Sequence, residues 1–115
     1  MHPRAGLVLV VAGASLVAGC EPGVPSPSAD AVNRGRVVWM TRCTSCHHVD
    51  PAKAGTLGPP VQGASRELLE ARVLRAAYPA GYTPKRATTL MQPLPDLAGS
   101  LDDLGAFLAS TGGAP

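Results

Sequence analysis

The residues that could do chemistry most directly lie in the short run Arg-Cys-Thr-Ser-Cys-His at positions 42–47. The spacing C-x-x-C-H is typical of covalent haem attachment. Cys43 and Cys46 can each form a thioether with one vinyl group of the same porphyrin, and the next side chain, His47, is then directed at the iron. The motif therefore predicts one covalently bound haem c, attached through both thiols, with His47 as an axial ligand.

Two other chemistries use a pair of cysteines at this spacing. A structural zinc site needs four tetrahedral ligands, usually with a second Cys or His pair at a distance, but the only further histidine near the motif is the adjacent His48. A thioredoxin-like dithiol begins a helix that follows a strand, whereas the segment before Cys43 has the pattern of a helix. Haem attachment is the favoured interpretation, with zinc binding and dithiol redox chemistry as the alternatives.

The third cysteine, Cys20, stands in a different context. Residues 1–19 have a basic start and an apolar stretch that is short for a membrane span, which needs about 20 residues, and typical of a secretory signal. Residues 16–20, Leu-Val-Ala-Gly-Cys, resemble the lipobox of bacterial lipoproteins, which implies cleavage before Cys20 and its lipidation. Two or three acyl chains give a stable anchor. The alternatives are an ordinary signal peptide with a chance cysteine and an uncleaved anchor.

Residues 20–29 then form a Pro/Ser-rich tether to a single domain over residues 30–112. The expected location is therefore the outer, periplasm-facing or extracytoplasmic side of a bacterial membrane. The chain has a formal net charge of only +2, and nucleic-acid binding, which needs a clustered basic face, is excluded. A domain of roughly eighty residues is marginally stable without a metal, disulfides or a cofactor, so a large apolar macrocycle would supply the missing core.

Around the attachment motif the chain resembles the class I cytochrome c family, over nearly the whole of this domain. Residues 35–39, Gly-Arg-Val-Val-Trp, are similar to the family's first helix, and residues 57–63 are similar to its Gly-Pro loop. Residues 91–93, Met-Gln-Pro, resemble the methionine-ligand loop, and Phe107 follows in a final helix. The resemblance implies an all-α cytochrome c fold, in which three to four helices wrap around one covalently attached haem.

The resemblance also implies a role for residues of the haem pocket. The Pro59 carbonyl is expected to accept a hydrogen bond from His47 Nδ1, which orients the ring. Leu57 and Val61 are expected to pack on the porphyrin. Trp39 is expected to cover the haem edge or the crossing of the first and last helices.

Met91 is expected to be the second axial ligand. A thioether stabilises ferrous iron and raises the reduction potential, and the prolines that follow Met91 restrict the loop. Met1 belongs to the cleaved signal, and Met40 is expected on the first helix. The alternative is a gap-filling core methionine, in which case Lys85 or His48 would be the ligand.

Three helices must position these residues, and no segment alternates as a strand. The expected helices cover about 30–42, 66–78 and 100–112, and the loops 48–64 and 79–99 form the pocket walls. Asp30 and Ser65 are expected as N-caps, and residues 100–103 resemble a capping box. The expected inward faces are Leu69, Val73 and Ala76 in the middle helix, and Leu101, Leu104 and Leu108 in the last, which is expected to stop at Gly112-Gly113. Gly35 inside the first helix predicts a close crossing by another helix, and the family resemblance implies that this partner is the last helix at Phe107. The alternative is that Gly35 ends a shorter first helix.

Together these features predict an electron carrier rather than an enzyme. Iron held by two protein ligands has no open position for a substrate, so it would exchange single electrons with redox partner proteins. Tyr82 and Arg86 are candidates for hydrogen bonds to haem propionates, and Lys85 is a candidate for contact with a partner, although a solvated loop explains this segment equally well. The alternative functions are a haem subunit of a larger oxidoreductase, or a sensor or peroxidase-like protein if Met91 does not bind.

Overall fold

The computed structural model describes residues 25–110, together with residues 1 and 19. The predicted all-α class is confirmed, since no strand occurs among these residues. The elements are α1 (Ala29–Arg42), α2 (Arg66–Leu69), which continues as the π-helix η1 (Glu70–Leu74), the 3₁₀-helix η2 (Pro95–Ser100) and α3 (Leu101–Ser110). Cys20, the predicted stop at Gly112-Gly113 and nearly all of the predicted signal sequence lie outside the described residues. None of the described helices is both long and apolar enough to cross a membrane.

Helix α1 begins one residue earlier than predicted, because Ser28 and not Asp30 is its N-cap. The Ser28 hydroxyl accepts a hydrogen bond from the Ala31 N–H. Asp30 lies instead in the first turn, where the positive end of the helix dipole stabilises its carboxylate. The predicted end at Arg42 is confirmed.

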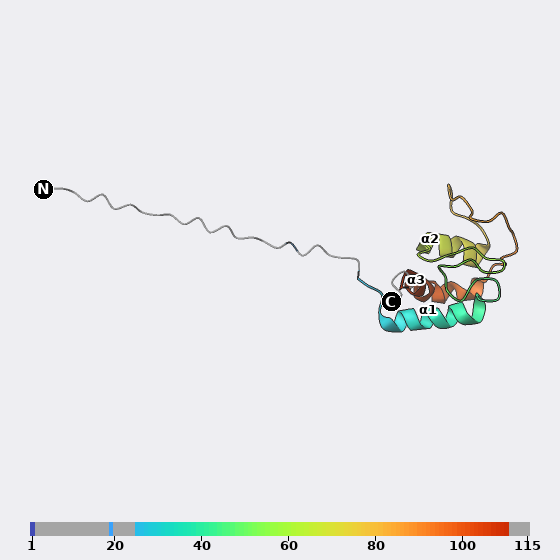
Figure 1. The fold of residues 1–115 in the computed structure, drawn as a ribbon, viewed down its shortest axis with the longest axis horizontal. Coiled ribbons are helices and arrows are strands. Elements are labelled where there is room, and N and C mark those ends of the chain that lie inside the picture. The colour runs from blue at the N-terminus through green and yellow to red at the C-terminus, as the bar shows by residue number, and fades with distance from the viewer. Residues whose placement is uncertain (2–18, 20–24, 111–115) are drawn as a thin grey trace.

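Helices α1 and α3 lie side by side (Figure 1), and they cross at Gly35 as predicted. A Cβ at Gly35 would overlap the backbone carbonyl of Asp103 and lie 2.9 Å from the Phe107 Cβ. Beside the crossing, the Arg34 guanidinium binds both carboxylate oxygens of Asp103, at 2.8 and 2.9 Å. Glycine inside a helix costs about 0.5–1 kcal/mol relative to alanine, and the close approach of α3 explains why it stands here.

The inward face of α3 is confirmed, since Leu101, Leu104 and Leu108 are at most 2% exposed. The core also contains Trp39, Leu69, Val73, Leu97 and Phe107. The expected capping box is wrong, because the chain enters α3 directly from η2 and not from an extended residue. The two aspartates bind arginines of other elements instead: Asp102 pairs with Arg66, and Asp103 with Arg34.

The middle helix begins as predicted but ends early. The Ser65 hydroxyl accepts from the Leu68 N–H, and Leu69 and Val73 are buried on the inward face. The predicted end at Tyr78 is wrong, since Ala76 adopts a positive φ of 51° and leaves the helix. The preceding π-helical turn has already shifted the register of the side chains, so Ala76 does not extend the buried stripe.

Candidate cofactor-binding site

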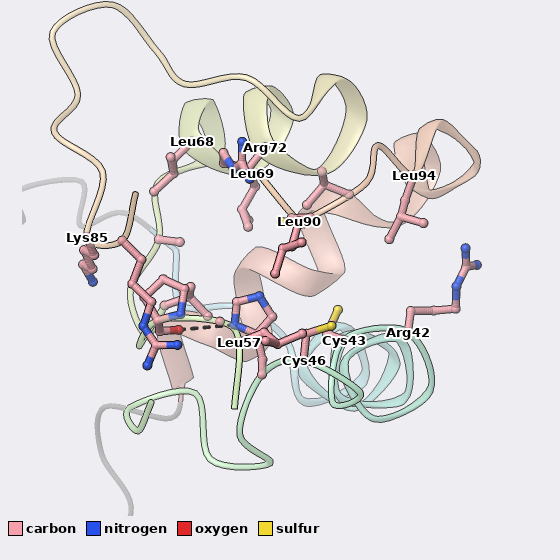
Figure 2. A pocket seen from close by; sticks show the side chains of 18 of the residues that line it. Arg42, Cys43, Cys46, Leu57, Leu68, Leu69, Arg72, Lys85, Leu90 and Leu94 are labelled. Atoms are coloured by element: carbon pink, nitrogen blue, oxygen red, sulfur yellow. Dashed lines mark hydrogen bonds between the residues drawn. The ribbon is translucent and has the colours of Figure 1, made fainter. Parts of the chain in front are cut away.

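A cavity of about 310 Å³ lies between the segment that follows α1 and the layer formed by α2, η1 and the loop after them. Figure 2 shows Leu68, Leu69 and Leu90 extending into it from one side, opposite Cys43, Cys46 and Leu57. Both long loops contribute to its wall. The first supplies Leu57, Gly58, Pro59, Val61 and Ala64, and the second Tyr82, Lys85, Arg86, Thr88, Leu90, Met91, Gln92 and Leu94.

The structure brings every predicted pocket residue of the domain into this one cavity. These residues are Trp39, Cys43, Cys46, His47, Leu57, Pro59, Val61, Tyr82, Arg86 and Met91. They come from α1, the Cys43–His47 motif and both loops, and they span more than fifty positions of the chain. Their roles toward a haem stay predictions, and Cys20 lies outside the described residues.

The His47 ring is fixed by its neighbours on the polypeptide. Its Nδ1 lies 3.2 Å from the Pro59 carbonyl oxygen, so Nδ1–H donates and Nε2 carries the lone pair. A Cβ at Gly58 would overlap the ring, and the Trp39 indole lies 5.3 Å away between ring centroids. Burial lowers the pKa of His47, which favours the neutral imidazole. A neutral ring with Nδ1 already bonded is the form in which histidine binds a metal through Nε2.

The loop that carries Pro59 is held directly against the attachment motif. The Cys46 carbonyl accepts from the N–H groups of Leu57 and Gly58, at 3.1 and 2.9 Å. Gly55 fits only without a side chain, because a Cβ there would lie 2.5 Å from the Cys46 carbonyl oxygen. These backbone contacts explain how a loop so rich in glycine and proline holds one conformation.

Neither thiol of the motif is in a disulfide, and both cysteines are half-buried. Burial raises the pKa of the Cys43 thiol to about 11. A redox-active dithiol depends on a thiolate whose pKa is lowered, so the surroundings of Cys43 do not favour that alternative. In the described part of the chain, no three His, Cys, Asp or Glu side chains come together in a potential metal cluster.

The two alternative ligands differ in position. His48 is not among the residues that line the cavity, and its Nδ1 accepts from the Asp50 N–H at 2.9 Å. Lys85 lines the cavity, but its Nζ donates to the Pro60 carbonyl at 2.8 Å. Met91 lines the cavity, is half-buried and packs against the hydrophobic core. Of the three, Met91 has the most suitable surroundings for a ligand in this cavity.

One part of the wall is cationic and aromatic, and sequence reasoning missed two of its residues, Arg72 and Tyr78. The Arg72 guanidinium lies 4.3 Å over the Tyr78 ring, which stacks on Tyr82 at 5.4 Å. Within residues 25–110, Arg72, Lys85 and Arg86 have no carboxylate partner. Arg72 follows Leu68 at helical spacing, so a second inward stripe on the middle helix could have indicated Arg72, whereas Tyr78 lies beyond the end of that helix.

No protein-family model matches the chain, and no curated protein matches it.

Proposed function

We propose that the chain is a small electron carrier that holds one covalently attached haem c, with the fold of the class I c-type cytochromes. One observation carries the proposal. Two thiols and an imidazole in the C-x-x-C-H arrangement line the same apolar cavity as Met91, which lies in a separate loop. Four groups that bind a haem in this family therefore lie around one space.

The residues around the cavity suit a haem in their chemistry. Cys43 and Cys46 would form the thioethers, and His47 and Met91 would bind the iron. The remaining wall is mainly aliphatic, with Leu68, Leu69 and Leu90 opposite the motif, which suits the apolar faces of a macrocycle. The cations and phenols of the wall suit its carboxylates, for which Tyr82 and Arg86 are the proposed partners.

When bound, a haem supplies an iron that can gain and lose one electron. The polypeptide then sets the conditions for that exchange. The Pro59 carbonyl orients His47 and makes the imidazole more electron-rich. The Met91 thioether would favour the reduced state, and an iron held by both His47 and Met91 would transfer electrons without binding a substrate.

The envelope location also belongs to this proposal. Lipidation at Cys20 and the tether over residues 20–29 would hold the domain on the outer side of a bacterial membrane. There it would exchange electrons with redox partner proteins, either as a free carrier or as a subunit of a larger oxidoreductase.

The proposal is tested with holoprotein matured in a bacterial periplasm. We expect a pyridine haemochrome of the c type, a reversible one-electron titration, and ferrous protein that does not bind carbon monoxide rapidly near neutral pH. Met91→Ala should open the iron to carbon monoxide, whereas Met40→Ala, the matched methionine on the exposed side of α1, should not. Rapid carbon monoxide binding or peroxidase turnover by the native protein would contradict the carrier function.

A further inference from the structure

One ion pair connects the attachment side of the cavity to the methionine side. Arg42 is the last residue of α1 and directly precedes Cys43, and its Nη1 lies 2.7 Å from Asp96 Oδ2. Asp96 belongs to η2, the helix that follows the loop with Met91. Figure 2 shows Arg42 extending past Cys43 at the end of the cavity where Leu94 also lies. The pair therefore joins two segments that are far apart in the sequence.

A second contact holds the same loop. The Leu94 N–H donates to the Val73 carbonyl at 2.6 Å. Because the middle helix ends before Ala76, the Val73 carbonyl has no helical donor one turn further on, and the Leu94 N–H takes that place. The early end of this helix is thus coupled to the position of the loop.

These two contacts together fix the C-terminal stem of the Met91 loop. Leu94 lies three residues after Met91 and Asp96 five, with Pro93 and Pro95 restricting the backbone between them. The stem is therefore short, stiff and fastened on both sides of the cavity. A change in the Arg42–Asp96 distance would move Met91 relative to His47, since α1 continues directly into the attachment segment.

We propose that Arg42 and Asp96 are positioning residues that keep the Met91 thioether at the iron. This inference rests on the proposed function, because it needs Met91 to be a ligand. Neither residue binds the iron. Their effect is to lower the fraction of time in which the loop moves away and leaves the sixth position open.

The chain contains a matched control for this pair. Arg34 and Asp103 also join α1 to a C-terminal element by an exposed Arg–Asp contact, at 2.8 Å. Neither residue lines the cavity. Arg34 makes two hydrogen bonds to Asp103 and Arg42 makes one to Asp96, so the control loses at least as much of an Arg–Asp contact, but only loss of the Arg42–Asp96 pair should release the loop.

The test measures carbon monoxide binding to ferrous holoprotein, which requires the sixth position to open. Exposed pairs of this kind change a local equilibrium by about 1.5- to 5-fold. Asp96→Asn and Arg42→Gln should each raise the binding rate by about that factor, with no further increase in the double variant. Asp103→Asn should leave the rate unchanged, although the denaturant midpoint of this variant should fall at least as far as that of Asp96→Asn, because Asp103 accepts two hydrogen bonds from Arg34. Asp96→Asn is the decisive variant, because it does not alter the residue next to Cys43.

An unchanged rate in Asp96→Asn, or an equal increase in Asp103→Asn, would overturn the positioning role. Met91→Ala separates this failure from that of the proposed function. If Met91→Ala speeds binding and Asp96→Asn does not, only the positioning role is wrong. If Met91→Ala changes nothing, the ligand assignment is wrong and the inference falls with it.

Discussion

His47 and Pro59 are joined by a hydrogen bond of 3.2 Å between the imidazole Nδ1 and the proline carbonyl. This contact links the attachment motif to the first long loop and fixes the tautomer of the ring. Proline has no backbone N–H, so its carbonyl oxygen is the only backbone group with which Pro59 can form a hydrogen bond. The geometry of the loop beside His47 therefore decides how the imidazole faces the cavity.

Gly58→Ala should disturb this arrangement more than its size suggests. The added methyl group would overlap the His47 ring, and forced contacts of this kind cost about 1–3 kcal/mol. We expect a lower denaturant midpoint and an altered haem spectrum in the matured protein. Gly99→Ala is the control, because nothing lies within 4 Å of a Cβ at Gly99. An unchanged spectrum and midpoint in Gly58→Ala would show that the ring is not confined from this side.

Gly35→Ala should destabilise the fold without changing the proposed haem site. A Cβ at Gly35 meets the Asp103 backbone, which cannot move without separating α1 from α3, so we expect a loss of about 1–3 kcal/mol in urea unfolding. Gly105→Ala is the helical control, since its Cβ meets only the Leu69 side chain at 3.4 Å. That variant should gain about 0.5–1 kcal/mol from helix propensity. Equal stability of Gly35→Ala and the parent would contradict the close crossing.

Ala76→Gly should stabilise the protein. Ala76 has a φ of 51°, which costs an L-residue roughly 1–2 kcal/mol, and the added freedom of glycine in the unfolded chain offsets part of the relief. A net gain of about 0.5–1 kcal/mol is expected in urea unfolding. Ala77→Gly, at an exposed neighbour without a positive φ, should instead lose stability. A loss in both variants would show that Ala76 is not strained.

The two surface ion pairs of α1 should make stability depend on acid. The Arg34 guanidinium lowers the pKa of Asp103 through a hydrogen bond, and Arg42 does the same for Asp96. A carboxylate whose pKa is lower in the folded state stabilises the fold above its ordinary pKa of 3.8, and this contribution disappears as the pH falls through the lowered value.

The check is urea unfolding at a series of pH values from neutral to below 3.8. The parent should lose stability across the acid range, and Asp103→Asn should lose less, because its side chain does not titrate. Parallel curves for the two proteins would mean that the pair contributes nothing to the pH dependence.

The sequence was most informative where the determinants are local. The spacing of Cys43, Cys46 and His47 is a property of one short segment, and the leucines of α3 repeat at a helical interval. Gly35 marked a close approach because a glycine inside a helix requires a reason. The motif indicated residues that share the cavity, and the leucines and Gly35 indicated how α3 packs in the core and against α1.

Features that depend on contacts between distant segments were not predictable. The middle helix ends before Ala76, and the Val73 carbonyl accepts from the Leu94 N–H instead of from a helical donor. Helix patterns along the chain contain no sign of that contact. The aspartates at 102 and 103 had the composition of a capping box, but they pair with arginines of α1 and α2. Ser and Asp are both favoured N-cap residues, so residue type alone does not decide whether Ser28 or Asp30 caps α1.

The most direct test of the account is the intact mass of protein matured in a periplasm that contains haem-attachment machinery. The account predicts a mass increase of one haem, with neither Cys43 nor Cys46 open to alkylation, and no increase when both cysteines are replaced by serine. A mature protein of unmodified domain mass, with both thiols readily alkylated, would contradict it.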